Sequence, residues 1–480
     1  MPDAAPEEGQ QLHRALGLRD LVLFNLVAVL GLRWLSTSAK AGPSAIALWV
    51  LAALLFFVPQ GLAVLELSSR FPNEGGVYVW TKKALGDGHG FLCGWCYWIN
   101  NVLYYPNLLI STAAIALYVV GKGDGPLAHD WTYIIAATMI ALWVAVWLNV
   151  VGLGTGKWLQ NLGGLGTYVP GLILIAVGLI AALSHHPSAN PITAKNVAPD
   201  LTNLGTLNLW ASIAFAFAGL ELSSTMGDEI RDPSRNLPRS IYIAAPLIAL
   251  AYIAGSSALL WLVPVSDINI VSGFLQGISA GTSAISPALW WIPAAAAAAY
   301  TVGNIGGVGA WLTGPARVAF VIGLDRYFPP AFGKVHPKWR TPYVAILVQA
   351  ALASVFLLIS QLGRGTKVED AYLALLDTQL LIYFIPYLYL FASFLIHRRK
   401  LGAESAPVRV PGGPVVATIV GGAGFLVTAF AMVVAMIPPG DQAAPWLFEA
   451  KVVGGATTFL LIGGGIYWRA QRRAAATTRP

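Results

Sequence analysis

Charged residues are scarce in this sequence. Asp, Glu, Lys and Arg make up 11% of the 480 residues, and 56% are hydrophobic, whereas a soluble globular domain carries about 25% charged residues. This deficit excludes an ordinary soluble fold and indicates an integral membrane protein. The net charge of +7 does not indicate a nucleic-acid partner, because the basic residues lie in the segments between apolar runs.

Cysteine is rarer still, with only Cys93 and Cys96, which lie in the apolar run FLCGWCYW. The CxxC spacing can mark a redox or metal site. No further cysteine or nearby histidine completes a ligand set, so we interpret both residues as packing residues in a membrane helix. We therefore expect no metal and no cofactor.

Several signature motifs are also missing. No HExxH or similar pair of catalytic groups occurs, so we do not expect an enzyme or catalytic residues, and no GxxxxGK[ST] loop occurs, which argues against ATP-driven pumping. The first twenty residues are polar and contain no short apolar core followed by a cleavage site, so we expect no cleaved signal peptide.

Long apolar runs are what the sequence has in abundance. Many are about 20 residues long, enough to cross about 30 Å of hydrocarbon. We predict an all-α membrane domain over residues 21–468, with tails at 1–20 and 469–480. The twelve predicted spans are 21–40, 43–67, 90–120, 131–152, 158–183, 207–227, 239–263, 287–313, 342–361, 371–396, 414–437 and 447–468.

The basic residues between these spans are distributed unevenly. If the N-terminus lies inside, 22 Lys and Arg residues fall on the inside and 6 on the outside, with Arg33 in the first span. Basic residues concentrate on the cytoplasmic side of membrane proteins. The asymmetry predicts a multi-pass protein of the cell (plasma or inner) membrane with both termini in the cytoplasm.

Two spans combine small residues with a charge at membrane depth. In the sixth, Phe217-Ala218-Gly219 is followed by Glu221, and in the first, Gly31 is followed by Arg33. A charge in lipid is costly, but it is tolerated where a broken helix lines a polar cavity. Because these spans lie five apart, we predict that helices 1 and 6 are interrupted and belong to an inverted repeat.

Four stretches carry a resemblance to a known family: LELSSRFPNEGGVYVWTKKALG, FAFAGLELSSTMGDEIRDPSRNLPRS, GPARVAFVIGLDRYFPPAFGKVHPKWRTP and RVPGG at 409–413. In this order they resemble the amino acid–polyamine–organocation superfamily of secondary transporters, and the last resembles a motif of glutamate/γ-aminobutyrate antiporters. The resemblance implies five spans, five inverted spans and two appended spans, with alternating access to a site between spans 1 and 6.

The resemblance also assigns roles to residues of the sixth span. It implies that Phe215 closes over the substrate, that Ala218 contacts it, that Gly219 forms a turn with free backbone groups, and that Glu221 is a proton-responsive gate. The first span departs from the family pattern, since Gly31-Leu32-Arg33 replaces the Gly-Ser/Thr-Gly whose amides hold the substrate carboxylate. The candidate substrate-binding residues are Gly31, Leu32, Arg33, Trp34, Phe215, Ala218 and Gly219.

Several of these residues have two interpretations. Arg33 either holds a substrate carboxylate bidentately or pairs with Glu221 or Asp377, and Glu221 either gates or makes a fixed hydrogen bond to the span-1 backbone. Asn100 and Asn101 either reach the substrate or join helices. Asp377 either lines the path or pairs with a base. For Glu66 we predict an ion pair at a helix end with Arg70 or a loop base.

The function predicted from these patterns is secondary transport of amino acids or related metabolites, by exchange. Some proton-coupled members of the family hold a lysine in span 5; here Thr167 lies near that place. The alternatives are a symporter for amino acids or polyamines driven by protons or sodium, and a membrane nutrient sensor that binds without transporting. The predicted partners are an amino acid or amine and the lipid bilayer.

Overall fold

The computed structural model describes residues 12, 14–123, 125–359, 368–401, 406–437 and 445–477. These residues form helices and connections, with no strand among them and one isolated bridge between Leu16 and Ile230. The all-helical class is therefore as predicted.

The longer helical elements are α1 (Leu18–Val29), α2 (Arg33–Ala39), α3 (Ser44–Ala52), η2 (Ala53–Phe57), α4 (Val58–Arg70), α5 (Val77–Leu85), α6 (Asp87–Ala116), α7 (Trp131–Val151), α8 (Leu153–Leu183), α10 (Leu204–Ala216), η5 (Leu222–Glu229), α11 (Pro233–Leu262), α12 (Gly273–Ile285), α13 (Ile292–Leu324), α14 (Tyr343–Ile359), α15 (Val368–Leu401), α16 (Gly413–Ala435) and α17 (Pro445–Thr477).

Nine helical segments of the described chain are long and apolar enough to cross a membrane. They match predicted spans 1 to 5, 7, 8, 10 and 11. The other three predicted spans differ, because span 6 is represented by the short apolar helix α10, span 9 by the short apolar helix α14, and span 12 lies within α17.

Both predicted interruptions are present. The first apolar segment is α1 followed, after Leu30–Leu32, by α2, and the sixth is α10 followed, after Phe217–Glu221, by η5. These two breaks place irregular backbone inside the bundle, where it is tolerated only because protein surrounds it.

Glycines bring α8 and α13 into direct contact. A Cβ on Gly163 would lie 2.8 Å from the Gly306 Cα, and a Cβ on Gly166 would lie 2.4 Å from the Ala299 carbonyl oxygen. Only residues without a side chain allow this approach. The approach sets the position of Thr167 on α8 relative to α13.

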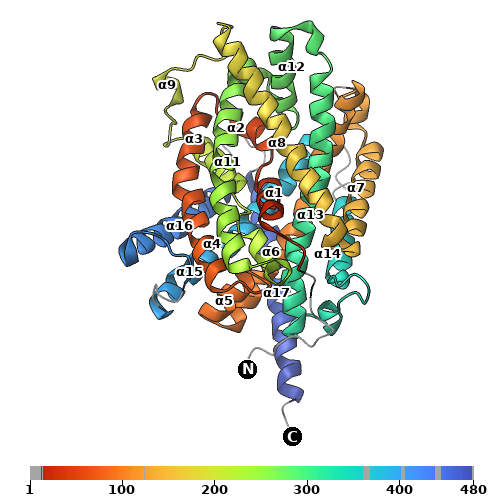
Figure 1. The fold of residues 1–480 in the computed structure, drawn as a ribbon, viewed down its shortest axis with the longest axis vertical. Helices are drawn as coiled ribbons and strands as arrows, with labels where there is room; N and C mark the ends of the chain where they lie inside the picture. The colour runs from red at the N-terminus through yellow and green to blue at the C-terminus, as the bar shows by residue number, and fades with distance from the viewer. Residues whose placement is uncertain are drawn as a thin grey trace.

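The two ends of the molecule are distinct. In Figure 1, α12 and the short helix α9 (Ala194–Val197) lie at one end, and α5 and the C-terminal part of α17 lie at the other. Glu66 holds elements together near the second end: it accepts from Arg70 Nη2 at 3.2 Å, from Arg398, and from the Val410 amide at 3.0 Å. The predicted Glu66–Arg70 ion pair is confirmed.

Cys93 and Cys96 are both buried and neither forms a disulfide. They lie in the first third of α6, packed with other apolar side chains of the core. Their interpretation as packing residues is confirmed.

Candidate functional site

The first helix break follows Leu30, whose extended backbone (φ −74°, ψ 110°) ends the hydrogen-bond ladder of α1. Beyond it, the Gly31 amide donates to the Tyr252 hydroxyl at 3.0 Å, and the Arg33 amide donates to the Tyr300 hydroxyl at 3.3 Å. The two tyrosines belong to α11 and α13. Side chains of other helices thus satisfy amides that the break releases.

The second break turns at Gly219, whose φ of 129° favours glycine. A Cβ there would also lie 3.1 Å from the Trp311 ring. The Gly219 amide donates to the Tyr387 hydroxyl at 2.8 Å and to Glu221 Oε2 at 3.2 Å. The sequence correctly places a turn at Gly219, but its amide is engaged within the protein.

One hydroxyl joins the two breaks. Tyr252 Oη accepts from the Gly31 amide and lies 2.6 Å from the Val29 carbonyl oxygen and 3.1 Å from the Ala216 carbonyl oxygen. It has a single proton and therefore donates to one of these carbonyls at a time. Its position holds the end of α1 against the end of α10.

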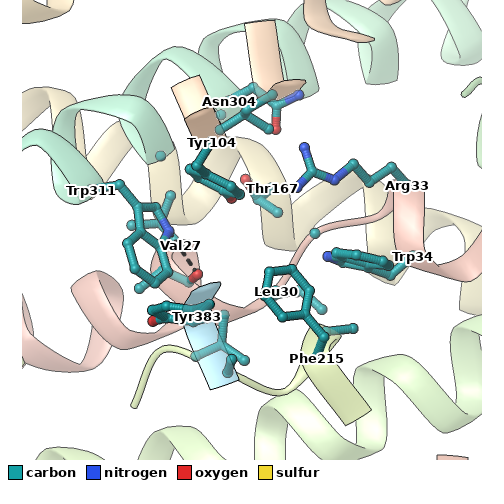
Figure 2. Close-up of a pocket in the computed structure, with 18 of the residues that line it drawn as sticks. Val27, Leu30, Arg33, Trp34, Tyr104, Thr167, Phe215, Asn304, Trp311 and Tyr383 are labelled. Carbon is teal, nitrogen blue, oxygen red and sulfur yellow. Dashed lines mark hydrogen bonds between the residues drawn. The ribbon is translucent and has the colours of Figure 1, made fainter. Parts of the chain in front are cut away.

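A pocket lies where the breaks meet, with about 530 Å³ of empty space including its opening. Figure 2 shows side chains from several helices around it. Among the described residues that line it, Arg33 is the one that carries a charge. The predicted site residues that line the pocket are Gly31, Arg33, Trp34, Asn100, Phe215 and Ala218.

Other predicted site residues lie outside this lining. Leu32, Gly219, Glu221 and Asn101 are not among the residues that form the pocket wall. Asn101 Nδ2 donates to the Tyr97 carbonyl oxygen of its own helix at 2.7 Å, so this donor is engaged locally. The side chain of Asp377 lies outside the described part of the structure.

Arg33 is the cation of the pocket. Its side chain is 1% exposed, and Figure 2 shows its guanidinium reaching across the pocket toward Tyr104 and Thr167. The guanidinium carbon lies 5.3 Å from the ring centroids of both Trp34 and Tyr104, and it interacts with the Tyr104 hydroxyl. Aromatic rings at this distance stabilise a cation without neutralising its charge.

Glu221 is buried behind the pocket wall, where it accepts five hydrogen bonds. Its Oε1 accepts from the hydroxyls of Tyr97 at 3.1 Å and Tyr383 at 2.6 Å. Its Oε2 accepts from the Tyr387 hydroxyl at 2.5 Å, Gln60 Nε2 at 3.1 Å and the Gly219 amide at 3.2 Å. The donors come from α4, α6, α15 and the second break, so the carboxylate joins four parts of the bundle.

Two interpretations of Glu221 are corrected by this arrangement. Arg33 is not among its partners, so the Arg33–Glu221 ion pair, one of the alternatives for Arg33, is not formed. Its backbone bond goes to Gly219 of the sixth segment and not to the first segment. Neutral donors, which are short-range and directional, satisfy Glu221 in place of a cation.

Sequence reasoning missed several residues of the pocket wall, among them Asn304, Trp311 and Tyr383. Asn304 was visible as a polar residue inside a glycine-rich run, and it donates to Thr112 Oγ1 at 2.8 Å. Trp311 Nε1 donates to the Ala28 carbonyl oxygen at 3.0 Å, shown as a dashed line in Figure 2. Nothing in the local sequence distinguishes Trp311 or Tyr383 from other membrane aromatics.

A second buried charge cluster lies away from the pocket, around Arg317 on α13. Arg317 Nε donates to Glu229 Oε2 at 2.7 Å, and its Nη2 donates to Glu229 Oε1 at 3.0 Å. Glu74 Oε1 lies 3.9 Å from Arg317 Nε, and Glu74 Oε2 accepts from the Asp228 amide at 3.1 Å. This cluster joins η5 and the connection before α5 to α13.

Comparisons with known proteins agree with these features. A family model described as amino acid permease matches residues 16–457. An uncharacterised transporter of Legionella pneumophila is 30% identical over 456 residues, which cover 94% of this chain and 96% of that protein.

Relatives with more specific names are more distant. A glutamate/γ-aminobutyrate antiporter of Lactococcus lactis is 23% identical over 396 residues, covering 82% of this chain and 78% of the antiporter. A probable agmatine/putrescine antiporter of the same species is 23% identical over 428 residues, covering 88% of each chain. These relatives are transporters and not enzymes.

Proposed function

Because the chain belongs to the amino acid permease family, we propose that it is a secondary active transporter that exchanges amino acids or closely related metabolites across the cell membrane. The observation that carries this proposal is the pocket between two helix breaks, lined by a buried arginine and aromatic rings. Binding sites at discontinuous membrane helices are typical of alternating-access transporters. The names of the antiporter relatives favour exchange.

The architecture we propose is twelve spans, built from five spans, five inverted spans and two appended spans. Two breaks five spans apart support the repeat, because inverted repeats place discontinuous helices in corresponding positions. The charge bias supports cytoplasmic termini.

In this proposal Arg33 holds the carboxylate of the substrate, and Phe215 closes over it. The Phe215 ring packs edge-on against Trp34 and Tyr383, with centroids 5.6 Å apart in both cases. Phe215 therefore lies between a pocket residue of the first segment and a partner of Glu221. A movement of the Phe215 ring would therefore change its packing against both Trp34 and Tyr383.

Glu221 is the proposed gate. Its donors come from α4, α6 and α15, so separating these helices on the way to an open state requires some of its hydrogen bonds to break. Protonation removes acceptor capacity from a carboxylate, and this supports the proton-responsive role that the family resemblance implies.

Thr167 lines the pocket near the place where some proton-coupled relatives hold a lysine. A threonine hydroxyl does not titrate in the physiological range. This difference supports exchange over proton symport.

Counterflow in proteoliposomes tests the proposal. Vesicles containing the purified protein are loaded with an unlabelled amino acid, and uptake of a labelled amino acid is followed with and without the internal load. We expect the load to accelerate uptake and an imposed sodium gradient to have no effect. Binding without flux would instead identify a sensor, and strict sodium dependence would identify a symporter.

A further inference from the structure

A second cavity of the protein is an open groove between α1, α8 and α11. It holds about 900 Å³ of empty space including its opening. The groove is lined by Leu18, Arg19, Val22, Leu23, Leu165 and Ile243. Five of these six side chains are apolar, and none of the six lines the pocket at the helix breaks. The groove is therefore a separate feature from the proposed substrate site.

The groove exists because α8 and α11 separate at this end of α1. Farther along they are in direct contact, since a Cβ on Gly178 of α8 would lie 2.6 Å from the Ala258 Cβ of α11. Here α1 lies between them (Figure 1), and Asn25 Nδ2 donates to Ser240 Oγ of α11 at 3.0 Å. Every residue of α1 from position 24 to its end is buried. The helix therefore reaches the surface only within its first six residues, which form the floor of the groove.

The groove lies where three apolar segments begin. Leu18–Ala39, Lys157–Leu183 and Pro233–Leu262 are each long and apolar enough to cross a membrane. Their first residues lie together, because Lys157 Nζ is 3.8 Å from Asp20 Oδ2 and the Arg231 amide donates to the Leu16 carbonyl oxygen at 2.9 Å. A helix rises about 1.5 Å per residue, which places Ile243 about 15 Å along α11 from its start. The groove therefore extends from the end of the spans to the depth of lipid acyl chains.

Exposed arginines stand at the shallow end of the groove. Arg19 lines the groove and is exposed. Arg239 is exposed and precedes Ile243 by about one turn, which places both on one face of α11, and the exposed Arg235 precedes Arg239 by another turn. In the proposed orientation this end faces the cytoplasmic leaflet, whose anionic lipids attract basic residues beside membrane helices.

The acidic residues in the same segments are fewer and have partners. Asp20 accepts from the Gly17 amide and from Asn161 Nδ2 of α8, both at 3.0 Å. Asp232 accepts from Ser234 Oγ in the first turn of α11 at 3.4 Å. Segments 18–23, 157–165 and 232–243 hold four basic residues and these two acids. These walls of the groove therefore carry a net positive charge.

We infer that the groove binds an anionic phospholipid, with an acyl chain between Leu165 and Ile243 and the phosphate at Arg19 and Arg239. An arginine fork matches the oxygens of a phosphate, and the apolar walls match the chain. A zwitterionic lipid offers the same chain, but its cationic group is repelled by the arginines. The bound lipid contacts α1, which belongs to the first apolar segment together with α2 and Arg33. The inference concerns a ligand other than the transported substrate.

Photo-cross-linking locates the lipid on the full-length protein. The purified protein is reconstituted in phosphatidylcholine vesicles with a trace of phosphatidylglycerol that carries a diazirine in its acyl chain. The comparison probe is phosphatidylcholine with the same diazirine, and cross-linked peptides are identified by mass spectrometry. We expect cross-links at residues 22–23, 165 or 243. The yield from the anionic probe should be at least about fivefold higher, because each basic residue near an anionic membrane surface contributes about fivefold in affinity.

Substitutions then assign the preference to the groove. Arg19→Gln and Arg239→Gln should each lower the yield of the anionic probe about fivefold. Leu165→Trp narrows the apolar part and should lower the yield from both probes. Arg469→Gln removes an exposed arginine of α17, outside the groove, and Leu183→Trp changes a leucine that is 71% exposed at the far end of α8; these are the matched controls. Thermal unfolding in detergent shows that each variant is folded.

The outcomes separate a lipid site from its alternatives. A preference for the anionic probe at these residues that both arginine substitutions reduce would support the inference. Equal yields from the two probes, or cross-links confined to other residues, would overturn it. An equal loss in Arg469→Gln would overturn it in favour of general attraction by surface charge.

Competition separates a lipid from a soluble anion. Unlabelled phosphatidylglycerol should displace the anionic probe, whereas inorganic phosphate should not, because it lacks the acyl chain that the apolar walls hold. Displacement by phosphate as complete as by the unlabelled lipid would overturn the inference. Cross-linking does not require transport, so failure here leaves the proposed exchange function standing, and failure of counterflow leaves the lipid site standing.

Discussion

Tyr383 connects Glu221 to the pocket: its hydroxyl donates to Glu221 Oε1 at 2.6 Å, and its side chain forms part of the pocket wall. The substrate space and the buried carboxylate therefore share one side chain. Tyr383 also packs edge-on against Phe215. A movement of the Tyr383 side chain in the pocket wall therefore changes the hydrogen bonding of Glu221, and this requires no direct contact between the substrate and Glu221.

This connection predicts different effects for two conservative substitutions. Glu221→Gln replaces one acceptor oxygen with a donor, so at least one of the tyrosine hydroxyls loses its acceptor. We expect substrate binding to be retained, exchange to slow, and its pH dependence between pH 5 and 8 to flatten. Tyr383→Phe keeps the ring in the wall and should slow exchange while preserving the pH dependence. The measurements are binding to the purified protein and counterflow at each pH; a Glu221→Gln profile that follows the parent would exclude Glu221 as the proton-responsive group.

Tyr252 gives a second prediction, on stability. Tyr252→Phe keeps the stacking on Trp49, whose ring lies 4.2 Å away, but removes the hydroxyl that joins the breaks. Leaving a buried amide and carbonyls without this partner costs about 1–3 kcal/mol. We expect a lower melting temperature and weaker substrate binding. Tyr133→Phe is the control, because it loses one bond to the Ala113 carbonyl oxygen away from the breaks. Equal effects of the two substitutions on substrate binding would contradict the prediction.

Several features of the fold could be predicted from the sequence because their signals are local. Apolar runs identify spans wherever a helix is long and unbroken. The breaks were visible because a glycine and a charge stand within a few residues of each other, as Gly31 and Arg33 or Gly219 and Glu221 do. The span at 207–227 was predicted to be interrupted, and it forms α10 and η5, since the turn at Gly219 divides it.

The partners of Glu221 could not be predicted in the same way. Gln60 and Tyr387 lie 161 and 166 residues from it in the sequence. The chain has 17 tyrosines, and aromatic residues in membrane helices commonly pack or lie at interfaces. Only the three-dimensional arrangement of α6 and α15 selects the three tyrosines that donate to Glu221. The same lack of a local signal concealed Trp311 in the pocket wall.

The third prediction concerns orientation. Cysteines are placed at two exposed positions on opposite ends of the molecule, Lys195→Cys on α9 and Ala476→Cys on α17 (Figure 1). Cys93 and Cys96 are buried and should contribute little background. With cytoplasmic termini, a membrane-impermeant maleimide labels the first variant in intact cells and the second only after permeabilisation. Labelling of both from the same side would contradict the twelve-span arrangement.

The last prediction concerns Glu74, which shares the surroundings of Arg317 with Glu229. Arg317 gives two short hydrogen bonds to Glu229 and leaves Glu74 at 3.9 Å. Burial, followed by the nearby charges of Glu229 and Asp228, raises the pKa of Glu74 well above its ordinary value, against the opposing effects of Arg317 and the Asp228 amide. Burial also raises the pKa of Asp228, opposed by Arg14.

The sign of the pH effect follows from these raised pKa values. A raised pKa means that the folded protein binds the proton of Glu74 more tightly than the unfolded chain does, so stability decreases as the pH rises from the ordinary glutamate value of 4.5 through the raised value. A tenfold difference in proton affinity between the folded and unfolded states corresponds to about 1.4 kcal/mol. Glu74→Gln should therefore raise the melting temperature in detergent at pH 8 and reduce its decline between pH 5 and 8.

Glu229→Gln is the contrast, because breaking a buried ion pair costs about 3–5 kcal/mol. This substitution should lower the melting temperature throughout the range from pH 5 to 8. A Glu74→Gln protein that melts below the parent at pH 8 would show that the Glu74 carboxylate is a needed partner of Arg317 and not a second, protonated acid.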